Sequence, residues 1–105
     1  MSNQKIYKYE QYELRYQIDQ RRCGKCGILA THISHRIAAT KVNIKKYGWQ
    51  IIQHCFNLVP ACCLAHNDCW NIGNNPNKSF RLIELIKTRG NEKLTSKEIT
   101  EVINE

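Results

Sequence analysis

The sequence predicts a small α+β domain that is stabilised by zinc, with a short β-hairpin at its centre and helices at both ends. Three observations lead to this prediction. The chain has only 105 residues, two cysteine-containing half-sites enclose its middle, and apolar residues recur at helical spacing near both ends. A domain of this size buries a modest core and is often reinforced by a metal. We therefore expect a single domain over residues 1–105, with its core at about 20–76.

Helices are predicted at both ends of the chain. Tyr9, Tyr12 and Tyr16 recur at three- and four-residue steps, with no Gly or Pro between them. Thr95 and Glu98 are spaced as a capping box, which marks the start of a last short helix. The expected helices span residues 8–22, 77–89 and 96–103.

Between these helices the sequence predicts two short extended segments and a further helix. Gly24 and Gly27 permit a tight turn around the first two cysteines. Gly48 interrupts a polar stretch, and Gly73 ends the helix that follows the second half-site. The expected elements are a strand at 29–37, a loop at 38–50, an extended segment at 57–61 and a helix at about 64–72.

Positive charge is concentrated in the first two thirds of the chain, which has a net charge of +7 overall. No carboxylate occurs between Asp19 and Asp68. The basic residues of this stretch are Arg21, Arg22, Lys25, Arg36, Lys41, Lys45 and Lys46. We expect Arg15, Arg21 and Arg22 to lie near solvent. Such a segment favours a polyanionic partner, nucleic acid first.

The cysteine content is explained best by metal ligation. The chain has six cysteines, a polar N-terminal region without a secretory signal, and no run of about 18 apolar residues that would span a membrane. Disulfides are rare in the reducing cytosol, where paired cysteines more often bind a metal. We therefore expect a cytoplasmic, metal-binding protein that does not enter a membrane.

Two short-range pairs of ligands predict one structural zinc site. Cys23 and Cys26 are separated by two residues, so both thiols can reach one ion from a tight turn. Cys62 and His66 are the preferred second pair, at the start of the following helix. Cys63 or Cys69 replacing a member of that pair is the alternative. The remaining cysteines, Cys55 among them, are expected to act as small buried apolar residues.

His35 is the candidate general base. It lies within the first predicted strand, and a neutral imidazole can accept a proton from water when its other nitrogen is fixed by a hydrogen bond. His32 lies three residues earlier and points to the opposite face of a flat strand. His32 is the alternative base, with His35 then in a supporting position. The preferred interpretation of both His32 and His54 is a structural role.

Two asparagines and a basic segment complete the candidate site. Asn57 begins the second extended segment and is positioned to fix the intervening loop. Asn67 and Asn71 are four residues apart on a predicted helix, so they share one face and can reach a common ion. Trp49 and Trp70 are expected to pack in the core. The side chains expected to contact nucleic-acid phosphates are Arg36, Lys41, Lys45 and Lys46.

The series His35, Asn57 and Asn67, enclosed by the two half-sites, resembles the HNH (ββα-metal) endonuclease motif in its zinc-containing, treble-clef form. The segment from Asn57 to Cys62 is similar to the family's approach to its second zinc half-site. The pair His66-Asn67 resembles one in which the first residue holds zinc and the second reaches a catalytic metal. The resemblance covers about residues 20–76, is closest to small prophage and restriction-associated members, and implies a ββα-metal (treble-clef-like) core.

The resemblance implies a metal-dependent endonuclease that hydrolyses phosphodiester bonds in double-stranded DNA. His35 is then the general base, Asn57 orients its loop, and Asn67 binds a catalytic Mg²⁺ or Mn²⁺ ion. Apart from the resemblance, Ser34 or Asn71 is a candidate for a further ligand of that ion. Zinc has a structural role. Because one site cuts one strand, we also expect a homodimer that assembles through the terminal helices.

The chain departs from the family pattern directly before the candidate base, and this departure supports a rival to the endonuclease hypothesis. Many members carry Asp or His directly before the base, where this chain has Ser34. Asp68 is the only carboxylate between Asp19 and Glu84, and it lies about 100° around the predicted helix from Asn67. The rival is a non-catalytic, zinc-stabilised module that binds nucleic acid. A third, weaker hypothesis is a zinc-stabilised protein-interaction domain.

Overall fold

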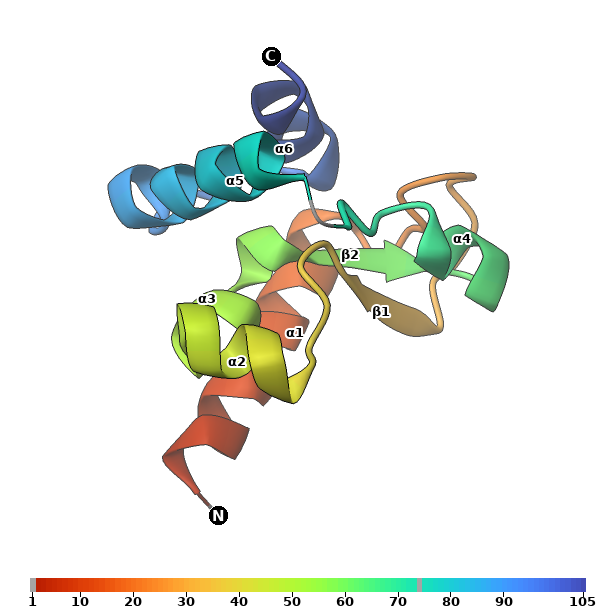
Figure 1. The fold of residues 1–105 in the computed structure, drawn as a ribbon. Helices are drawn as coiled ribbons and strands as arrows, with labels where there is room; N and C mark the ends of the chain where they lie inside the picture. The colour runs from red at the N-terminus through yellow and green to blue at the C-terminus, as the bar shows by residue number, and fades with distance from the viewer. Residues whose placement is uncertain (1, 74) are drawn as a thin grey trace.

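A single two-stranded hairpin lies between a long N-terminal helix and several shorter helices in the computed structural model, which describes residues 2–73 and 75–105. The pair α5 and α6 lies at one end of the molecule, α2 and α3 lie beside α1, and α4 follows the hairpin at the far side (Figure 1). The elements in chain order are α1 (Asn3–Ile18), β1 (His32–His35), α2 (Lys41–Tyr47), α3 (Trp49–Ile52), the 3₁₀ turn η1 (Cys55–Asn57), β2 (Leu58–Ala61), α4 (Leu64–Asp68), α5 (Pro76–Arg89) and α6 (Ser96–Ile103).

Helix α1 begins and ends earlier than the expected range of 8–22. The side chain of Ser2 accepts a hydrogen bond from the backbone N–H of Lys5 at 3.3 Å and caps the helix. At the other end Gln20 and Arg21 adopt positive φ angles of 57° and 55°, which a right-handed helix cannot contain. The helix therefore stops before the first pair of cysteines.

The hairpin is antiparallel and short. Strand β1 pairs with β2 so that His32 lies opposite Ala61 and His35 lies opposite Leu58. Every residue of β2 is buried. Helix α4 is shorter than the expected range of 64–72, because the backbone N–H of Ile72 donates to the carbonyl of Arg36 at 3.0 Å and draws the chain back across the hairpin. Strands β1 and β2 and helix α4 therefore contact one another as one unit.

Residues 41–47 form helix α2, where the sequence had predicted a loop. The side chain of Thr40 accepts a hydrogen bond from the N–H of Asn43 at 3.2 Å, which caps this helix. Gly48 ends it at a φ of 92°. Lysine is a good helix former, so the polar composition that indicated a loop is also compatible with an exposed helix.

The C-terminal helices close the apolar core. Helix α5 is capped by Asn75, and α6 starts at a complete capping box between Thr95 and Glu98 and spans the expected range of 96–103. Their apolar sides pack on η1 and on the end of α3. The buried apolar core comprises Ile37, Ile52, Cys55, Phe56, Leu82, Leu85, Leu94, Ile99 and Ile103.

The expectation that Arg15 lies near solvent was wrong. Arg15 is 0% exposed, and its guanidinium donates to the carbonyls of Cys55 at 2.9 Å and Leu94 at 3.1 Å. It also pairs with Asp19 at 3.3 Å. The carboxylate of Asp19 in turn accepts hydrogen bonds from the backbone N–H and hydroxyl of Ser96. This buried polar cluster joins α1 to η1 and to the start of α6.

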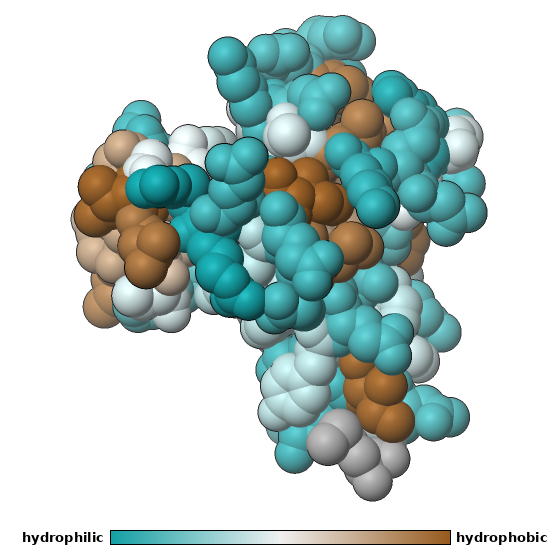
Figure 2. All heavy atoms as spheres, turned by 180° about the vertical axis from the view of Figure 1, so that it is seen from behind, coloured by the Kyte–Doolittle hydropathy of each residue, from teal (hydrophilic) through white to brown (hydrophobic). Residues whose placement is uncertain are grey.

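Apolar side chains also remain exposed at the end of the molecule that carries α4 and the cysteine loop. In Figure 2, which shows the molecule from behind, this end lies at the left, and hydrophobic residues gather there. Ile28, Leu29 and Leu64 are 58%, 65% and 71% exposed. These exposed side chains lie outside the main apolar core.

Within residues 2–73 and 75–105, no helix combines the length and the apolar character that crossing a membrane requires.

Candidate metal centre and candidate active site

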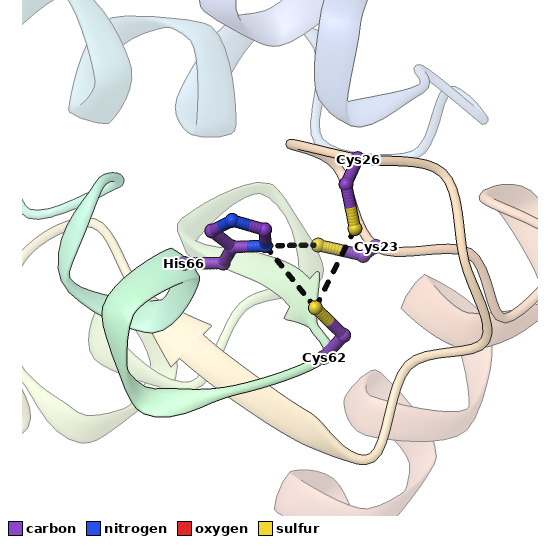
Figure 3. Close-up of side chains that lie close together, drawn as sticks. All are labelled: Cys23, Cys26, Cys62 and His66. Carbon is purple, nitrogen blue, oxygen red and sulfur yellow. Dashed lines mark hydrogen bonds between the residues drawn. The ribbon is translucent and has the colours of Figure 1, made fainter.

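Three thiols and one imidazole converge between the turn that follows α1 and the start of α4. The ligand atoms of Cys23, Cys26, Cys62 and His66 all lie within 4.8 Å of one another. Figure 3 shows the four side chains pointing toward one another, two from the first turn and two from the segment after β2. Among the described residues, no other group of three or more His, Cys, Asp and Glu side chains is as close.

The separations fit a zinc-like ion. The Sγ atoms of Cys26 and Cys62 are 3.5 Å apart, and Nδ1 of His66 lies 3.6 Å from Sγ of Cys23 and 3.1 Å from Sγ of Cys62. Bond lengths of about 2.3 Å for Zn–S and about 2.0 Å for Zn–N place tetrahedral neighbours roughly 3.4–3.8 Å apart. Small adjustments therefore let all four side chains bind one ion, and the preferred ligand set is the one that the fold assembles.

The first two ligands are held by the backbone of a tight turn. The N–H of Gly27, at a φ of 79°, donates to the carbonyl of Cys23 at 2.9 Å. A side chain on Gly24 would approach Val59 to 2.8 Å, so this position fits only glycine. Burial would raise the pKa of Cys23, but backbone N–H groups of the turn lower it to about 6. A thiol that ionises readily is suited to metal ligation.

The other cysteines lie outside this cluster. Cys55 is fully buried in the apolar core, as expected. Cys63 is partly exposed, and Cys69 is exposed and donates to the carbonyl of Ala65 at 3.4 Å. The expectation of burial was therefore wrong for Cys69, and Cys63 is only partly buried.

A pocket of about 200 Å³ opens between the hairpin and α4, and we call it the His35 pocket. Its lining brings together three of the predicted site residues, Ser34, His35 and Asn67. Asp68 and Asn71 line it as well. Asp68 was expected on a different face of the helix from Asn67, yet both residues line the pocket, and α4 ends at Asp68.

His35 is held by partners that the sequence did not indicate. Its Nε2 lies 3.0 Å from Oε1 of Gln53, and its ring meets that of Tyr12 edge-on at 6.1 Å. Burial lowers the pKa of His35, and the nearby charge of Lys8 lowers it further, whereas the hydrogen bond that the ring donates to Gln53 raises it. The imidazole is therefore neutral near pH 7, as a general base must be.

Ser34 and Asn67 contact each other directly. Ser34 is 2% exposed, and its hydroxyl donates to the backbone carbonyl of Asn67 at 2.6 Å. This bond fixes α4 against β1. Because the Ser34 hydroxyl is already committed to this carbonyl, its oxygen has only lone pairs left to offer to an ion.

Asn57 is fully buried and closes the loop between the two strands. Its Oδ1 accepts from the N–H of Ile37 at 2.8 Å, and its Nδ2 donates to the carbonyls of Ile37 at 3.0 Å and Ile52 at 2.8 Å. The side chain does not line the His35 pocket. Its contacts instead fix the segment that leaves β1 directly after His35.

Arg36 cannot act as the surface phosphate contact that the sequence predicted. It is 1% exposed, its Nη2 donates to the carbonyl of Ser96 at 2.9 Å, and its guanidinium lies over the ring of Trp70 at 5.6 Å. Burial, followed by the charge of Arg15, lowers its pKa to about 9. The return of the chain after α4 places Trp70 over this side chain, which no local pattern reveals.

The predicted lysines remain on the surface, on α2. Lys41, Lys45 and Lys46 are exposed. Lys46 lies over the ring of Tyr47 at 5.1 Å and lines a different pocket, next to Pro76 and Ser79. His32, the alternative base, is exposed, and its ring contacts the hydroxyl of Thr31 at 2.6 Å. It does not line the His35 pocket.

Comparison with protein-family models, with curated proteins and with solved structures finds no match to this chain.

Proposed function

We propose that this chain is a metal-dependent DNA endonuclease of the HNH (ββα-metal) type, built on a zinc-stabilised treble-clef-like core. One observation carries the proposal: His35, Ser34 and Asn67 line a single pocket, at the junction of the hairpin with the helix that carries His66. The resemblance of the sequence to the HNH motif assigns His35 and Asn67 to one site, and Ser34 stands directly before His35. A basic chain with exposed lysines on α2 supports a polyanionic substrate.

His35 has the hydrogen bonding that a general base needs. Oε1 of Gln53 can only accept, so the hydrogen bond at 3.0 Å requires the proton of the neutral ring to lie on Nε2. Nδ1 is then the nitrogen that takes a proton from the attacking water. Asn57 contributes indirectly, by holding the backbone that follows His35.

The residues around His35 fit a weakly held divalent ion. The amide of Asn67, the carboxylate of Asp68 and the lone pairs of Ser34 are oxygen donors of the kind that Mg²⁺ and Mn²⁺ prefer. When bound, such an ion neutralises charge on the phosphate and its leaving oxygen. One carboxylate at the pocket is a sparse ligand set, so affinity for the ion should rise when a substrate phosphate is present.

Cleavage of both strands of a duplex requires two such sites or two successive nicks at one site. We propose a homodimer that forms through the terminal helices, where Phe80 on α5 is 67% exposed. Sedimentation of the zinc-bound protein tests this step separately from catalysis. If the protein is a monomer that nicks one strand at a time, the endonuclease proposal stands and the dimer proposal is wrong.

The decisive experiment is cleavage of supercoiled plasmid by the zinc-bound protein with added Mg²⁺ or Mn²⁺. We expect nicking that is lost at least about 100-fold in His35→Ala, because a general base typically contributes about 10²–10⁴. Zinc content and the circular dichroism spectrum should be unchanged. His32→Ala is the matched control and should retain activity.

The rival function is a zinc-stabilised module that binds nucleic acid without cutting it. The observation that favours it is the buried Ser34 at the position where an acidic or imidazole ligand is usual in the family. Plasmid binding without strand scission under any divalent ion would establish the rival. Equal nicking by wild type and His35→Ala would remove His35 from the mechanism.

A further inference from the structure

A second pocket adjoins His35 through one hydrogen bond. The partner of the imidazole, Gln53, also lines a pocket of about 250 Å³ between the start of α1 and α3, which we call the α1–α3 pocket. The two pockets thus meet at the His35–Gln53 pair. Whatever occupies the α1–α3 pocket lies beside the proposed base.

Helix α1 presents positive charge to this pocket. Lys5 and Lys8 line it, and together with Tyr12 they follow a three- and four-residue spacing that puts them on one face of the helix. Nζ of Lys8 lies 5.4 Å from the centre of the Tyr12 ring, and that ring lies 6.1 Å from the ring of His35. A continuous run of contacts therefore connects the lysine to the base.

No carboxylate opposes this charge among the described residues that line the α1–α3 pocket. The nearest acidic residues in the sequence of α1 are Glu10 and Glu13. Both lie roughly 140–160° around the helix from Lys8 at about 100° per residue. The pocket is therefore suited to an anion, because Lys5 and Lys8 are the charged side chains among the described residues that line it.

The opposite wall of the pocket is apolar and fixed. Ile44 and Trp49 form it. The Trp49 ring is held edge-on by Tyr7 at 5.2 Å, and the Tyr7 hydroxyl donates to the carbonyl of Gln50 at 2.8 Å. A pocket that combines ammonium groups with a fixed aromatic wall matches the phosphate and the flat base of a nucleotide.

We propose that the α1–α3 pocket binds the nucleotide next to the scissile phosphate, with Lys5 and Lys8 on the phosphate backbone and Trp49 against the base or sugar. This inference rests on the proposed endonuclease function. It extends the substrate surface from α2 to α1, a helix to which the sequence assigned no contact with substrate.

The test measures duplex DNA binding by zinc-bound protein in a His35→Ala background, without added divalent ion. The double variant Lys5→Gln/Lys8→Gln is compared with Lys87→Gln/Lys93→Gln, which removes the same charge from exposed positions on and after α5. We expect the first pair to weaken binding about tenfold or more and to reduce the slope of log K against log salt by roughly 1.8. The control pair should weaken binding less than about threefold, and Lys5→Arg/Lys8→Arg should restore affinity.

Equal losses in the two glutamine variants would overturn the inference, because they would mean that only the total charge matters. Unchanged affinity in Lys5→Gln/Lys8→Gln would overturn it as well. In both cases DNA binding by the parent protein would leave the proposed function standing. If the parent protein bound no DNA at all, the proposed function would fail first, and this subsite with it.

Discussion

At the scale of single residues, a buried asparagine controls the backbone beside the proposed base. The Asn57 side chain uses its oxygen and both hydrogens of its amide, and all three partners are backbone groups of the segments that flank the loop. Buried backbone groups need partners, and no apolar residue could satisfy them. This role explains why an asparagine stands directly before β2 without lining the His35 pocket.

Replacement of Asn57 by Ala should lower the free energy of unfolding by about 2–4 kcal/mol, because it leaves three buried backbone groups without partners. Urea unfolding of the zinc-bound protein measures this change. The control is Asn43→Ala, which removes one half-buried bond, from Nδ2 to the carbonyl of Ala38 at 2.9 Å. That control should cost about 1 kcal/mol. Equal losses in the two variants would contradict the assigned role of Asn57.

His54 should make the fold sensitive to acid. Burial lowers its pKa from 6.5 to about 4, and its Nδ1 accepts from the N–H of Phe56 at 3.0 Å. The unfolded chain therefore binds a proton below pH 6.5 that the folded chain refuses until about pH 4. Stability is full above pH 6.5 and falls as the pH drops through this window.

The variant His54→Asn isolates this effect, because an asparagine oxygen can still accept from the N–H of Phe56 but does not titrate. The urea midpoint of the wild type should fall relative to that of the variant as the pH drops from 6.5 to about 4. Protonation of the metal ligands affects both proteins equally. Parallel pH profiles would show that His54 does not titrate in this window.

At the scale of elements, the four candidate metal ligands lie at an end of the molecule that is outside the main apolar core. The turn between Cys23 and Leu29 is exposed apart from Cys23, and Ile28 and Leu29 pack against little. Helix α4 has only five residues, too few to be stable from helix propensity alone. A metal bound by the four ligands would therefore add the cross-link that these elements lack, whereas α1, α5 and α6 share the apolar core.

Removal of zinc should release this end of the molecule selectively. With a strong chelator, we expect backbone amides of residues 23–35 and 58–68 to lose protection from hydrogen exchange, while amides of α1 and α5 stay protected. Cys62→Ser should have the same effect and bind less metal, and Cys69→Ser should behave as wild type. Uniform loss of protection would mean that the metal stabilises the whole fold.

The elements differ in how far the sequence could predict them. Helix α6 was predictable because its capping box is a local signal that the structure uses in full. Helix α2 was missed because exposed lysines fit a loop and a surface helix equally well, and its cap at Thr40 has no glutamate at the matching position. The ligand pairs were predictable from spacing, whereas Gln53 and Tyr12 reach His35 only through tertiary packing.

At the scale of the whole molecule, two buried arginines join segments that are far apart in the sequence. Arg15 reaches carbonyls 40 and 79 residues away, and Arg36 reaches one 60 residues away. From the sequence, both side chains were expected near solvent. Arginines are seldom buried without partners, and these partners lie in segments that are remote in the sequence. The positive charge available to a nucleic acid is correspondingly smaller than the net charge suggests.

Arg15→Met should therefore destabilise the fold strongly, far more than loss of an arginine from the surface. The methionine fills much of the volume but leaves the carbonyls of Cys55 and Leu94 without donors and Asp19 without its cation. We expect a loss of about 3–5 kcal/mol, which urea unfolding followed by circular dichroism measures. The control is Arg89→Met, which breaks an exposed pair with Glu92 and should leave the midpoint nearly unchanged.

A second comparison separates the contribution of the Arg15 guanidinium to stability from that of the Asp19 carboxylate. Asp19→Asn keeps the hydrogen bond from the N–H of Ser96 and should cost less than Arg15→Met, because the carbonyls that Arg15 satisfies keep their donor. If Arg15→Met were tolerated as well as a surface substitution, α1 would not depend on this cluster to hold its place against the C-terminal helices. The His35 pocket, which α1 supports through Tyr12, would then have to be fixed by other contacts.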